Sequence, residues 1–258
     1  MPEKKTSLLY KFIKAMVRLV YPKIEVVGAE KLPGEPVVVV ANHTQMNGPI
    51  ACELYFPGKH DTWCAEQMMH LKEVPGYAFQ DFWSQKPKGI RWFYRILSYL
   101  IAPLSVCVFN NANTIPVYRD IRLRTTFRLS MERLQAGSSM IIFPECSQPH
   151  NNIVNCFQDK FVDLARLYYQ KTGVELAFVP LYIAPALKKM VLGEPIRFCA
   201  QAPIKAERTR ICSYLMDRIT ETAQALPEHT VVPYCNIPKK EYPSNLPKGA
   251  SADENTCC

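Results

Sequence analysis

Residues 37–49 read Val-Val-Val-Val-Ala-Asn-His-Thr-Gln-Met-Asn-Gly-Pro, an apolar run followed by a polar turn. Four consecutive valines are typical of a strand that is covered on both faces, as in parallel sheets. Gly48-Pro49 then begins a helix, so His43 lies in a strand-to-helix turn at the carboxyl edge of the sheet, where α/β folds place their sites. An imidazole there can remove a hydroxyl proton near neutral pH, although it can equally be a local hydrogen-bonding residue.

The rest of the chain alternates short apolar runs with helical patterns. Strands are expected at residues 24–27, 37–41, 114–117, 140–143, 177–183 and 196–198, and helices at 48–55, 121–135, 157–170 and 205–226. Alternation of this kind predicts an α/β protein. We expect one layered domain at 22–235, with a central mostly parallel or mixed sheet flanked by helices, an N-terminal amphipathic helix at 1–21 and a polar C-terminal tail at 236–258.

Composition excludes several classes of protein. A chain of 258 residues is long enough to form a hydrophobic core without disulfides or metal ions to stabilise it. Its content of 48% hydrophobic and 21% charged residues excludes a disordered chain, a collagen and a coiled coil. Ten cysteines are scattered without a CxxC pair, which argues against structural zinc and favours reduced thiols in the cytoplasm. The terminal Cys257-Cys258 is either a lipid-modified tail or a simple polar terminus.

Positive charge is concentrated at the N-terminus. The chain carries a net +8, and its first 23 residues hold six basic groups against Glu3. A helix at 7–21 would have an apolar stripe and a basic face, comprising Leu8, Phe12, Met16 and Val20 opposite Lys11, Lys14 and Arg18. It is too short and too charged to span a bilayer. Either it lies among lipid headgroups with its basic side toward the phosphates, or it packs on the domain as an ordinary amphipathic helix.

A second apolar stretch covers residues 90–109. Its uncharged part, 96–109, has fourteen residues, fewer than the roughly 20 that cross a bilayer. Arginines and aromatic rings at one end suit an interfacial or re-entrant helix. A buried core helix is the alternative. Because no nucleic-acid motif accompanies the basic residues, we expect an anionic membrane surface as partner and no nucleic acid.

Four blocks follow one another in a characteristic order: Asn42-His43 after a strand, then 114–119 (Thr-Ile-Pro-Val-Tyr-Arg), 141–145 (Ile-Ile-Phe-Pro-Glu) and 178–183 (Phe-Val-Pro-Leu-Tyr-Ile). Together they resemble the blocks of the glycerolipid acyltransferase family, whose best-known members are lysophosphatidate acyltransferases. The resemblance spans about residues 22–198, and it lies in the order and context of the blocks.

The resemblance implies an acyltransferase that moves a fatty acyl group from acyl-CoA or acyl carrier protein to a hydroxyl of a lysophospholipid or glycerol-phosphate-like acceptor. It would need no other cofactor and no metal, and would work peripherally on the cytoplasmic face of a membrane. His43 would be the base. Arg119 would hold the acceptor phosphate, which suits a guanidinium fork, and Glu145 would belong to the acceptor pocket with Asn42, Cys146 and Ser147. Alternatively, Arg119 pairs with Asp120, and Glu145 caps the following turn.

Three departures from the family pattern bear on activity. The family places an aspartate five positions after the histidine to orient the imidazole, whereas this chain has Gly48, with the uncharged Asn47 one place early. Replacing such a carboxylate by an amide costs about 10⁴ in turnover in a hydrolase triad. Another carboxylate could serve, from Glu53, Asp61 or Asp120. Otherwise the chain is a catalytically silent lipid- or acyl-binding relative.

The second departure follows Glu145. Cys146-Ser147-Gln148 stands where the family usually has Gly-Thr-Arg, which weakens the case for a phosphate-bearing acceptor. Cys146 with His150 could be read as a nucleophile and its base, or Cys146 as a small residue in a tight turn. The third departure is a long aromatic-rich region, 83–109, between the first two blocks. A thioester hydrolase using the same site is a further alternative, and the three remaining histidines, His60, His70 and His229, are expected at the surface.

Overall fold

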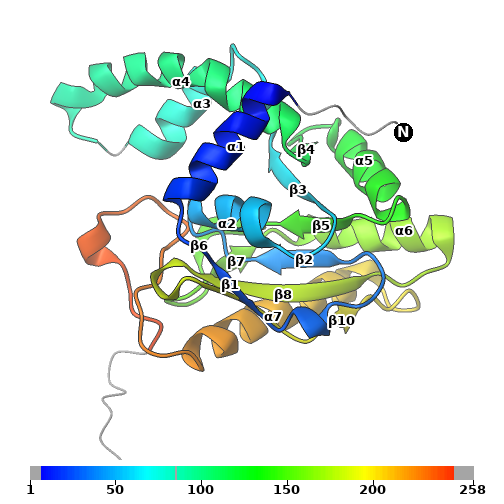
Figure 1. Ribbon diagram of the computed structural model, residues 1–258. Helices are drawn as coiled ribbons and strands as arrows, with labels where there is room; N and C mark the ends of the chain where they lie inside the picture. The colour runs from blue at the N-terminus through cyan, green and yellow to red at the C-terminus, as the bar shows by residue number, and fades with distance from the viewer. Residues whose placement is uncertain (1–6, 85, 247–258) are drawn as a thin grey trace, which may run out of the picture.

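The computed structural model describes residues 7–84 and 86–246, which form a central sheet between layers of helices (Figure 1). The sheet has eight strands. Its order is β1 (Glu25–Val27), β9 (Lys189–Leu192), β8 (Ala177–Ala184), β2 (Val38–Ala41), β5 (Ser139–Ile142), β3 (His60–Ala65) and β4 (Thr114–Val117), with β10 (Ile196–Arg197) also pairing with β8. The expected α/β class with a mostly parallel sheet is confirmed.

The five strands from β8 to β4 run parallel to one another, while β9 and β10 are antiparallel to β8. In the centre, Val39 of β2 lies opposite Ile141 of β5 and Val179 of β8. Because these strands share one direction, their carboxyl ends meet at a single edge. Every residue of β2 and β8 is buried, as a sheet covered on both faces requires.

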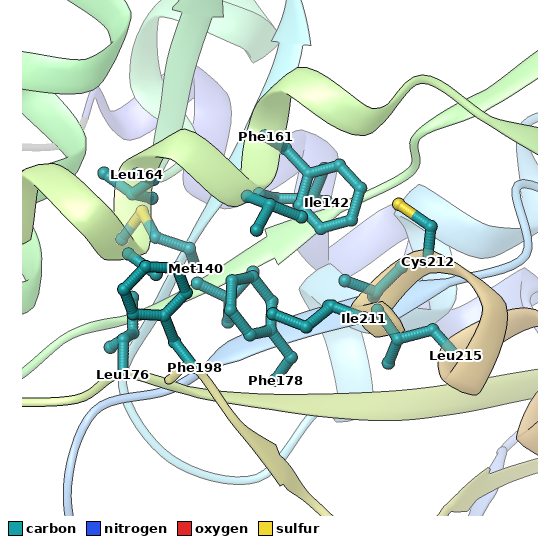
Figure 2. Packing of buried hydrophobic residues seen from close by; sticks show 14 of the residues in the cluster. Met140, Ile142, Phe161, Leu164, Leu176, Phe178, Phe198, Ile211, Cys212 and Leu215 are labelled. Carbon is teal, nitrogen blue, oxygen red and sulfur yellow. The ribbon is translucent and has the colours of Figure 1, made fainter. Parts of the chain in front are cut away.

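Alternate residues of β2 enter two different cores. Val39 and Ala41 pack toward α2 (Asn47–Tyr55) on one face. Val38 and Val40 belong to a larger cluster on the other face, which is covered by α5 (Leu123–Gln135), α6 (Asp163–Thr172) and α7 (Ile204–Gln224). Figure 2 shows this cluster, in which Phe178 and Met140 of the sheet meet helix residues such as Leu164 and Ile211.

Most expected elements are present, but two regions differ. Strand β3 was not expected because its sequence, His-Asp-Thr-Trp-Cys-Ala, shows no clear alternation of apolar residues. The helix expected at 157–170 begins only at α6. Before it, β7 (Asn155–Phe157) pairs with β6 (Glu145–Pro149) in a separate hairpin, and a 3₁₀ turn covers Asp159–Val162.

The remaining short elements connect the strands and helices. They are 3₁₀ turns at Ala29–Lys31, Glu66–Met69, Lys88–Ile90, Pro185–Leu187 and Lys239–Glu241, the helix α3 (Val74–Ala78) and a π-helical turn at Phe79–Trp83.

Helices α3 and α4 (Arg91–Asn111) form a hairpin that projects from the body of the domain (Figure 1). The alternative of a buried core helix at 90–109 is wrong, because Trp92 is 66% and Leu100 is 70% exposed. Among the described residues, one helical segment, 88–111, is long and apolar enough to cross a membrane by length and composition.

Helix α1 (Leu8–Val20) packs on the domain by the face opposite to the one expected. Lys14 pairs with Glu53 of α2, the Tyr10 hydroxyl donates to the same carboxylate, and Arg18 lies over the Tyr55 ring. The apolar stripe points outward instead, and Leu8 is 82% exposed. Lys14 and Arg18 of the basic face therefore hold the helix to the protein and do not face lipid phosphates.

Residues 236–246, which were expected to belong to a polar tail, are part of the folded structure. After α7, residues 227–246 return across the domain, and we call this stretch the C-terminal segment. Thr230 bridges to Ser244, and Asn245 is fully buried, donating from its side chain to the Ala223 carbonyl. Residues 1–6, 85 and 247–258, including Cys257 and Cys258, lie outside the described part of the chain.

Candidate active site

His43 lies in a tight turn between β2 and α2. The two residues after it, Thr44 and Gln45, both adopt left-handed backbone conformations, with φ of 46° and 55°. Such conformations are unfavourable for residues other than glycine, and a β-branched threonine rarely adopts them. The turn brings Gly48 against the His43 carbonyl, so α2 begins directly beside the imidazole. Local backbone strain of this kind is typical of functional sites.

The His43 imidazole is held by aromatic rings. Its centroid is 5.3 Å from Phe143 and 5.6 Å from Tyr234, and both contacts are edge-to-face. Nδ1 is buried and has no hydrogen-bond partner among the described residues. Burial lowers the pKa of His43 to about 4, an effect that contact with the Gln45 backbone partly offsets. At neutral pH the ring is therefore uncharged and able to accept a proton.

No carboxylate of the described residues takes the place of the missing aspartate. A Cβ added at Gly48 would lie 2.4 Å from the His43 carbonyl oxygen and 3.0 Å from the Phe143 ring. Of the candidates, Glu53 binds Tyr10 and Lys14 of α1. Two further candidates are also engaged elsewhere. Asp61 accepts from Ser138 at the far end of the sheet, and Asp120 binds Arg122 at the surface.

Glu145 lies beneath the His43 turn. Its Oε1 accepts from the His43 backbone N–H at 2.6 Å, and its Oε2 accepts from the Asn155 backbone N–H at 2.8 Å. Burial raises the pKa of Glu145 to about 7, against the opposing effect of these two donors. Both oxygens are thus used to join the His43 turn to the β6–β7 hairpin.

Arg119 follows β4 and lines the same cavity as His43. It forms no ion pair within the described residues, since Asp120 is bound by Arg122 instead. Lys160 also lines the cavity, is exposed, and forms no ion pair in that part of the chain. Asp81 lies near Arg119: burial raises the pKa of the Asp81 carboxyl, and the Arg119 charge opposes that effect. Two cations therefore face the cavity with their charge uncompensated by an ion pair.

The other candidate residues divide into two groups. Cys146 and Ser147 line the cavity, whereas Asn42 does not. The Asn42 amide is buried and exchanges hydrogen bonds with both backbone groups of Ile183, at 2.7 and 3.0 Å, so it joins β2 to β8. His150 is exposed, and no hydrogen bond links its ring to Cys146 in the described structure. The geometry therefore gives the cysteine nucleophile no base.

The cavity has a volume of about 880 Å³ and is walled mainly by apolar side chains. This is within the range of about 300–1,000 Å³ for ligand pockets. From His43 it runs past Trp63 of β3 and Phe127 of α5, and it reaches Ile13 of α1 and Val108 of α4. A long apolar chain could lie in such a space while its polar end meets His43.

Sequence reasoning missed three residues of this site: Phe143, Lys160 and Tyr234. Phe143 was visible as the end of an expected strand, directly before Pro144 and Glu145. Lys160 fell inside a stretch expected to be helical. Tyr234 had no signal, because it follows α7 in a Pro-rich stretch whose return to the sheet edge no local pattern indicates.

Similarity to known proteins is found among solved structures. No protein-family model matches the chain, and no curated protein does. The chain is similar to the crystal structure of the 1-acyl-sn-glycerophosphate (LPA) acyltransferase PlsC from Thermotoga maritima. Identity is 19%, the TM-score is 0.47, and the match covers 86% of this chain and 80% of that one. In fold, the chain resembles an LPA acyltransferase.

Proposed function

We propose that this chain is an acyltransferase that moves a fatty acyl group from a thioester, on coenzyme A or acyl carrier protein, to the hydroxyl of a lysophospholipid-like acceptor. One observation carries the proposal. A neutral imidazole, that of His43, and a guanidinium without an ion pair in the described chain, that of Arg119, line the same large apolar cavity.

The chemistry requires one base and no cofactor. His43 takes the proton of the acceptor hydroxyl as the oxygen attacks the thioester carbonyl. The tetrahedral intermediate collapses, the C–S bond breaks, and the thiolate leaves with the proton that His43 gives back. Because burial holds the pKa of His43 near 4, the imidazolium is short-lived and the base is present in its active form throughout the physiological range.

Acceptor recognition would use the cations of the cavity. Arg119 and Lys160 come from different elements, and neither charge is neutralised by a described ion pair. A guanidinium and an ammonium together match a phosphate group. The pair compensates for the second arginine that the sequence lacks after Glu145. We therefore propose an acceptor that carries a phosphate near its free hydroxyl.

Two exposed apolar surfaces support attachment to a membrane. The surface on α1 comprises Leu8, Leu9, Phe12, Met16, Leu19 and Val20. The surface at α4 comprises Ile90, Trp92, Phe93, Ile96, Tyr99, Leu100 and Leu104. The two helices contact each other, and the α1 backbone at Ser7 donates to the side chain of Asn111. Both helices also wall the cavity. A bilayer covering them would place acyl chains next to its entrance. We propose the cytoplasmic face, since the basic residues beside these surfaces suit its anionic lipids.

A silent lipid-binding relative is the second candidate, and one observation favours it: no described carboxylate orients the His43 ring. One assay separates the candidates. Purified protein receives acyl-CoA on anionic vesicles, with or without lysophosphatidate or a neutral lysolipid, and free thiol is measured. We expect release that depends on the acceptor and is lost by at least about 10²-fold in His43→Ala. Release without acceptor indicates a hydrolase, and lipid binding without release indicates the silent relative.

Two further sets of variants test the details. Arg119→Gln and Lys160→Gln should raise KM for a phosphate-bearing acceptor, whereas Arg166→Gln, at an exposed arginine outside the cavity, should leave it unchanged. Flotation with anionic vesicles should fall in Leu8→Ser and Leu100→Ser. It should persist in Val174→Ser, a matched control at an exposed apolar residue elsewhere. Equal flotation of all three would reject the two helices as the membrane contact.

A further inference from the structure

We propose that Tyr234 is a positioning residue for His43, holding its imidazole together with Phe143 in place of an orienting carboxylate. This inference rests on the proposed function, in which His43 is the base. It also makes the C-terminal segment, 227–246, a part of the active site.

The two rings constrain the imidazole from different parts of the chain. Phe143 follows β5 in the sheet, and Tyr234 comes from the C-terminal segment. Their planes are inclined to the His43 ring by 67° and 89°, at centroid distances of 5.3 and 5.6 Å. Edge-to-face contacts at these distances are favourable and depend on orientation. A quarter-turn of the imidazole about its χ2 angle would break both contacts, so the pair fixes the plane of the ring.

No described carboxylate performs this task. The position that would carry a carboxylate is Gly48, where the space of a Cβ is already taken by the His43 carbonyl, Phe143 and the Thr44 side chain. Nδ1 has no hydrogen-bond partner in the described chain. The nearest acid, Glu145, binds the backbone N–H of His43 and not its ring. The aromatic contacts are thus, together with the Gln45 backbone contact, the ring interactions that remain.

Tyr234 is itself held on both sides. Gln45, in the same turn as His43, donates from its side chain to the Tyr242 hydroxyl at 3.1 Å and to the Cys235 carbonyl at 3.4 Å. Asn236 donates to the Asp81 carbonyl at 2.7 Å, which joins the segment to the α3–α4 hairpin. Gln45 therefore holds the C-terminal segment in place, and Tyr234 of that segment covers the His43 ring. The left-handed conformation of Gln45 belongs to this arrangement.

The ring of Tyr234, and not its hydroxyl, makes the contact. The hydroxyl forms no hydrogen bond in the part of the chain that the structure describes, and Asp81 and Arg119 are its charged neighbours. Burial and the Asp81 charge raise the pKa of the phenol, against the effect of Arg119, so the ring stays neutral. Tyr234→Phe should therefore preserve the contact with the His43 ring, whereas Tyr234→Ala should remove it.

The test is a titration of the His43 ring by NMR in the full-length protein under reducing conditions. It compares the wild type with Tyr234→Phe, Tyr234→Ala and Cys235→Ala, the last being a control at the adjacent exposed residue. We expect a pKa near 4 for His43 in the wild type, in Tyr234→Phe and in Cys235→Ala. In Tyr234→Ala, water enters beside the ring, and the pKa should rise by at least one unit toward 6.5. An unchanged titration in Tyr234→Ala, or an equal rise in Tyr234→Phe, overturns the proposal.

Alanine at position 234 could disturb the C-terminal segment, and the resonances of buried His229 would reveal such a disturbance. In that case Tyr234→Leu takes the place of Tyr234→Ala. Leucine retains the apolar cover but not the ring geometry. We expect a low pKa with a second orientation of the His43 ring, seen as a doubled or broadened signal; a single wild-type signal contradicts the proposal.

Thiol release separates this proposal from the proposed function. In Tyr234→Ala, kcat should fall about 10-fold or more at nearly constant KM, and the acid limb of the pH profile should move upward; Tyr234→Phe should restore both. If no variant releases thiol but the titrations behave as expected, the acyltransferase proposal fails and the positioning role stands. If the wild type is active and the titrations do not differ, the positioning role alone fails.

Discussion

His43 and His229 are both largely withdrawn from solvent, but the groups around their rings differ. His229 is 7% exposed, its Nδ1 donates to the Pro227 carbonyl at 2.7 Å, and its Nε2 accepts from the Tyr182 hydroxyl at 2.8 Å. Its expected surface position is therefore wrong. His43 has aromatic neighbours, and its Nδ1 has no partner in the described chain.

The difference separates a structural histidine from one that is free to transfer protons. Hydrogen bonds to both nitrogens fix the tautomer of His229 and fasten the C-terminal segment to β8. The His43 ring lacks a pair of hydrogen bonds like those that stabilise His229, and it lines a cavity. A partly buried polar group without a partner is unfavourable for stability, so its presence needs a functional reason.

The largest expected effect on stability concerns His229. His229→Ala leaves the Tyr182 hydroxyl without its partner and removes one of two donors from the Pro227 carbonyl, the other being Asn245, which should lower the free energy of unfolding by about 3 kcal/mol. His43→Ala should change it by less than about 1 kcal/mol, because the ring borders an open cavity and has few polar contacts. Urea unfolding at pH 7, followed by tryptophan fluorescence, measures both. Equal losses would remove the distinction between the two histidines.

The second prediction uses the opposite pKa shifts of His43 and Glu145. His43 is lowered from 6.5 to about 4, so its contribution to stability is present above pH 6.5 and is lost as the pH falls toward 4. Glu145 is raised from 4.5 to about 7, so its contribution is present below pH 4.5 and is lost as the pH rises toward 7. Between pH 4.5 and 6.5 the two slopes should nearly cancel.

Glu145→Gln removes the pH dependence of the free energy of unfolding that comes from Glu145. The free energy of unfolding of the variant should rise by about 2 kcal/mol from pH 4.5 to 6.5, because of the two slopes only that of His43 remains. His43→Ala should show the reverse trend over the same interval. Urea titrations at five pH values in this range decide the matter. A flat curve for Glu145→Gln would show that the His43 ring is not desolvated.

The third prediction concerns the tightness of the His43 turn. Gly48→Ala should cost about 2 kcal/mol, since its Cβ would meet the His43 carbonyl at 2.4 Å. Gly48→Asp should cost at least as much and should not restore an orienting carboxylate. Gly76→Ala in α3 is the matched control: no atom lies within 4 Å of its Cβ, so stability should stay constant or rise slightly. Faster thiol release by Gly48→Asp would contradict the described turn.

The smallest expected effect distinguishes the two tyrosines that contact these histidines. Tyr182→Phe removes a buried hydrogen bond to His229 and should cost about 1 kcal/mol. Tyr234→Phe should cost nothing measurable, because no hydrogen bond of its hydroxyl is present within the described residues. Thermal unfolding of both variants at pH 7 provides the comparison, and a larger loss for Tyr234→Phe would reverse it.

Local sequence patterns predicted the fold well where apolar residues were continuous. The valines of β2 and the apolar run of β8 indicated a sheet covered on both faces, and most helix boundaries lay within two residues of those expected. Strand β3 was missed because tertiary pairing with β5 and β4, and not local propensity, determines it.

The candidate site could be predicted only where its residues end strands. His43, Arg119 and Glu145 each follow a parallel strand, so a common edge was expected from their sequence positions. Tyr234 could not be found in this way, since its place depends on Gln45 and Asn236. The outward turn of the α1 stripe was also unpredictable, because amphipathicity alone does not say which face meets the protein.

The position of β2 between β5 and β8 has a consequence for synthesis on the ribosome. Its second neighbour, β8, begins at Ala177, and the Asn42 amide needs Ile183. A growing chain therefore carries an apolar strand that lacks one or both of its neighbours for well over a hundred residues, a state prone to aggregation. We expect translation products that stop before β8 to be cut by protease near Asn42. The histidine can reach its final environment only after nearly the whole polypeptide has emerged.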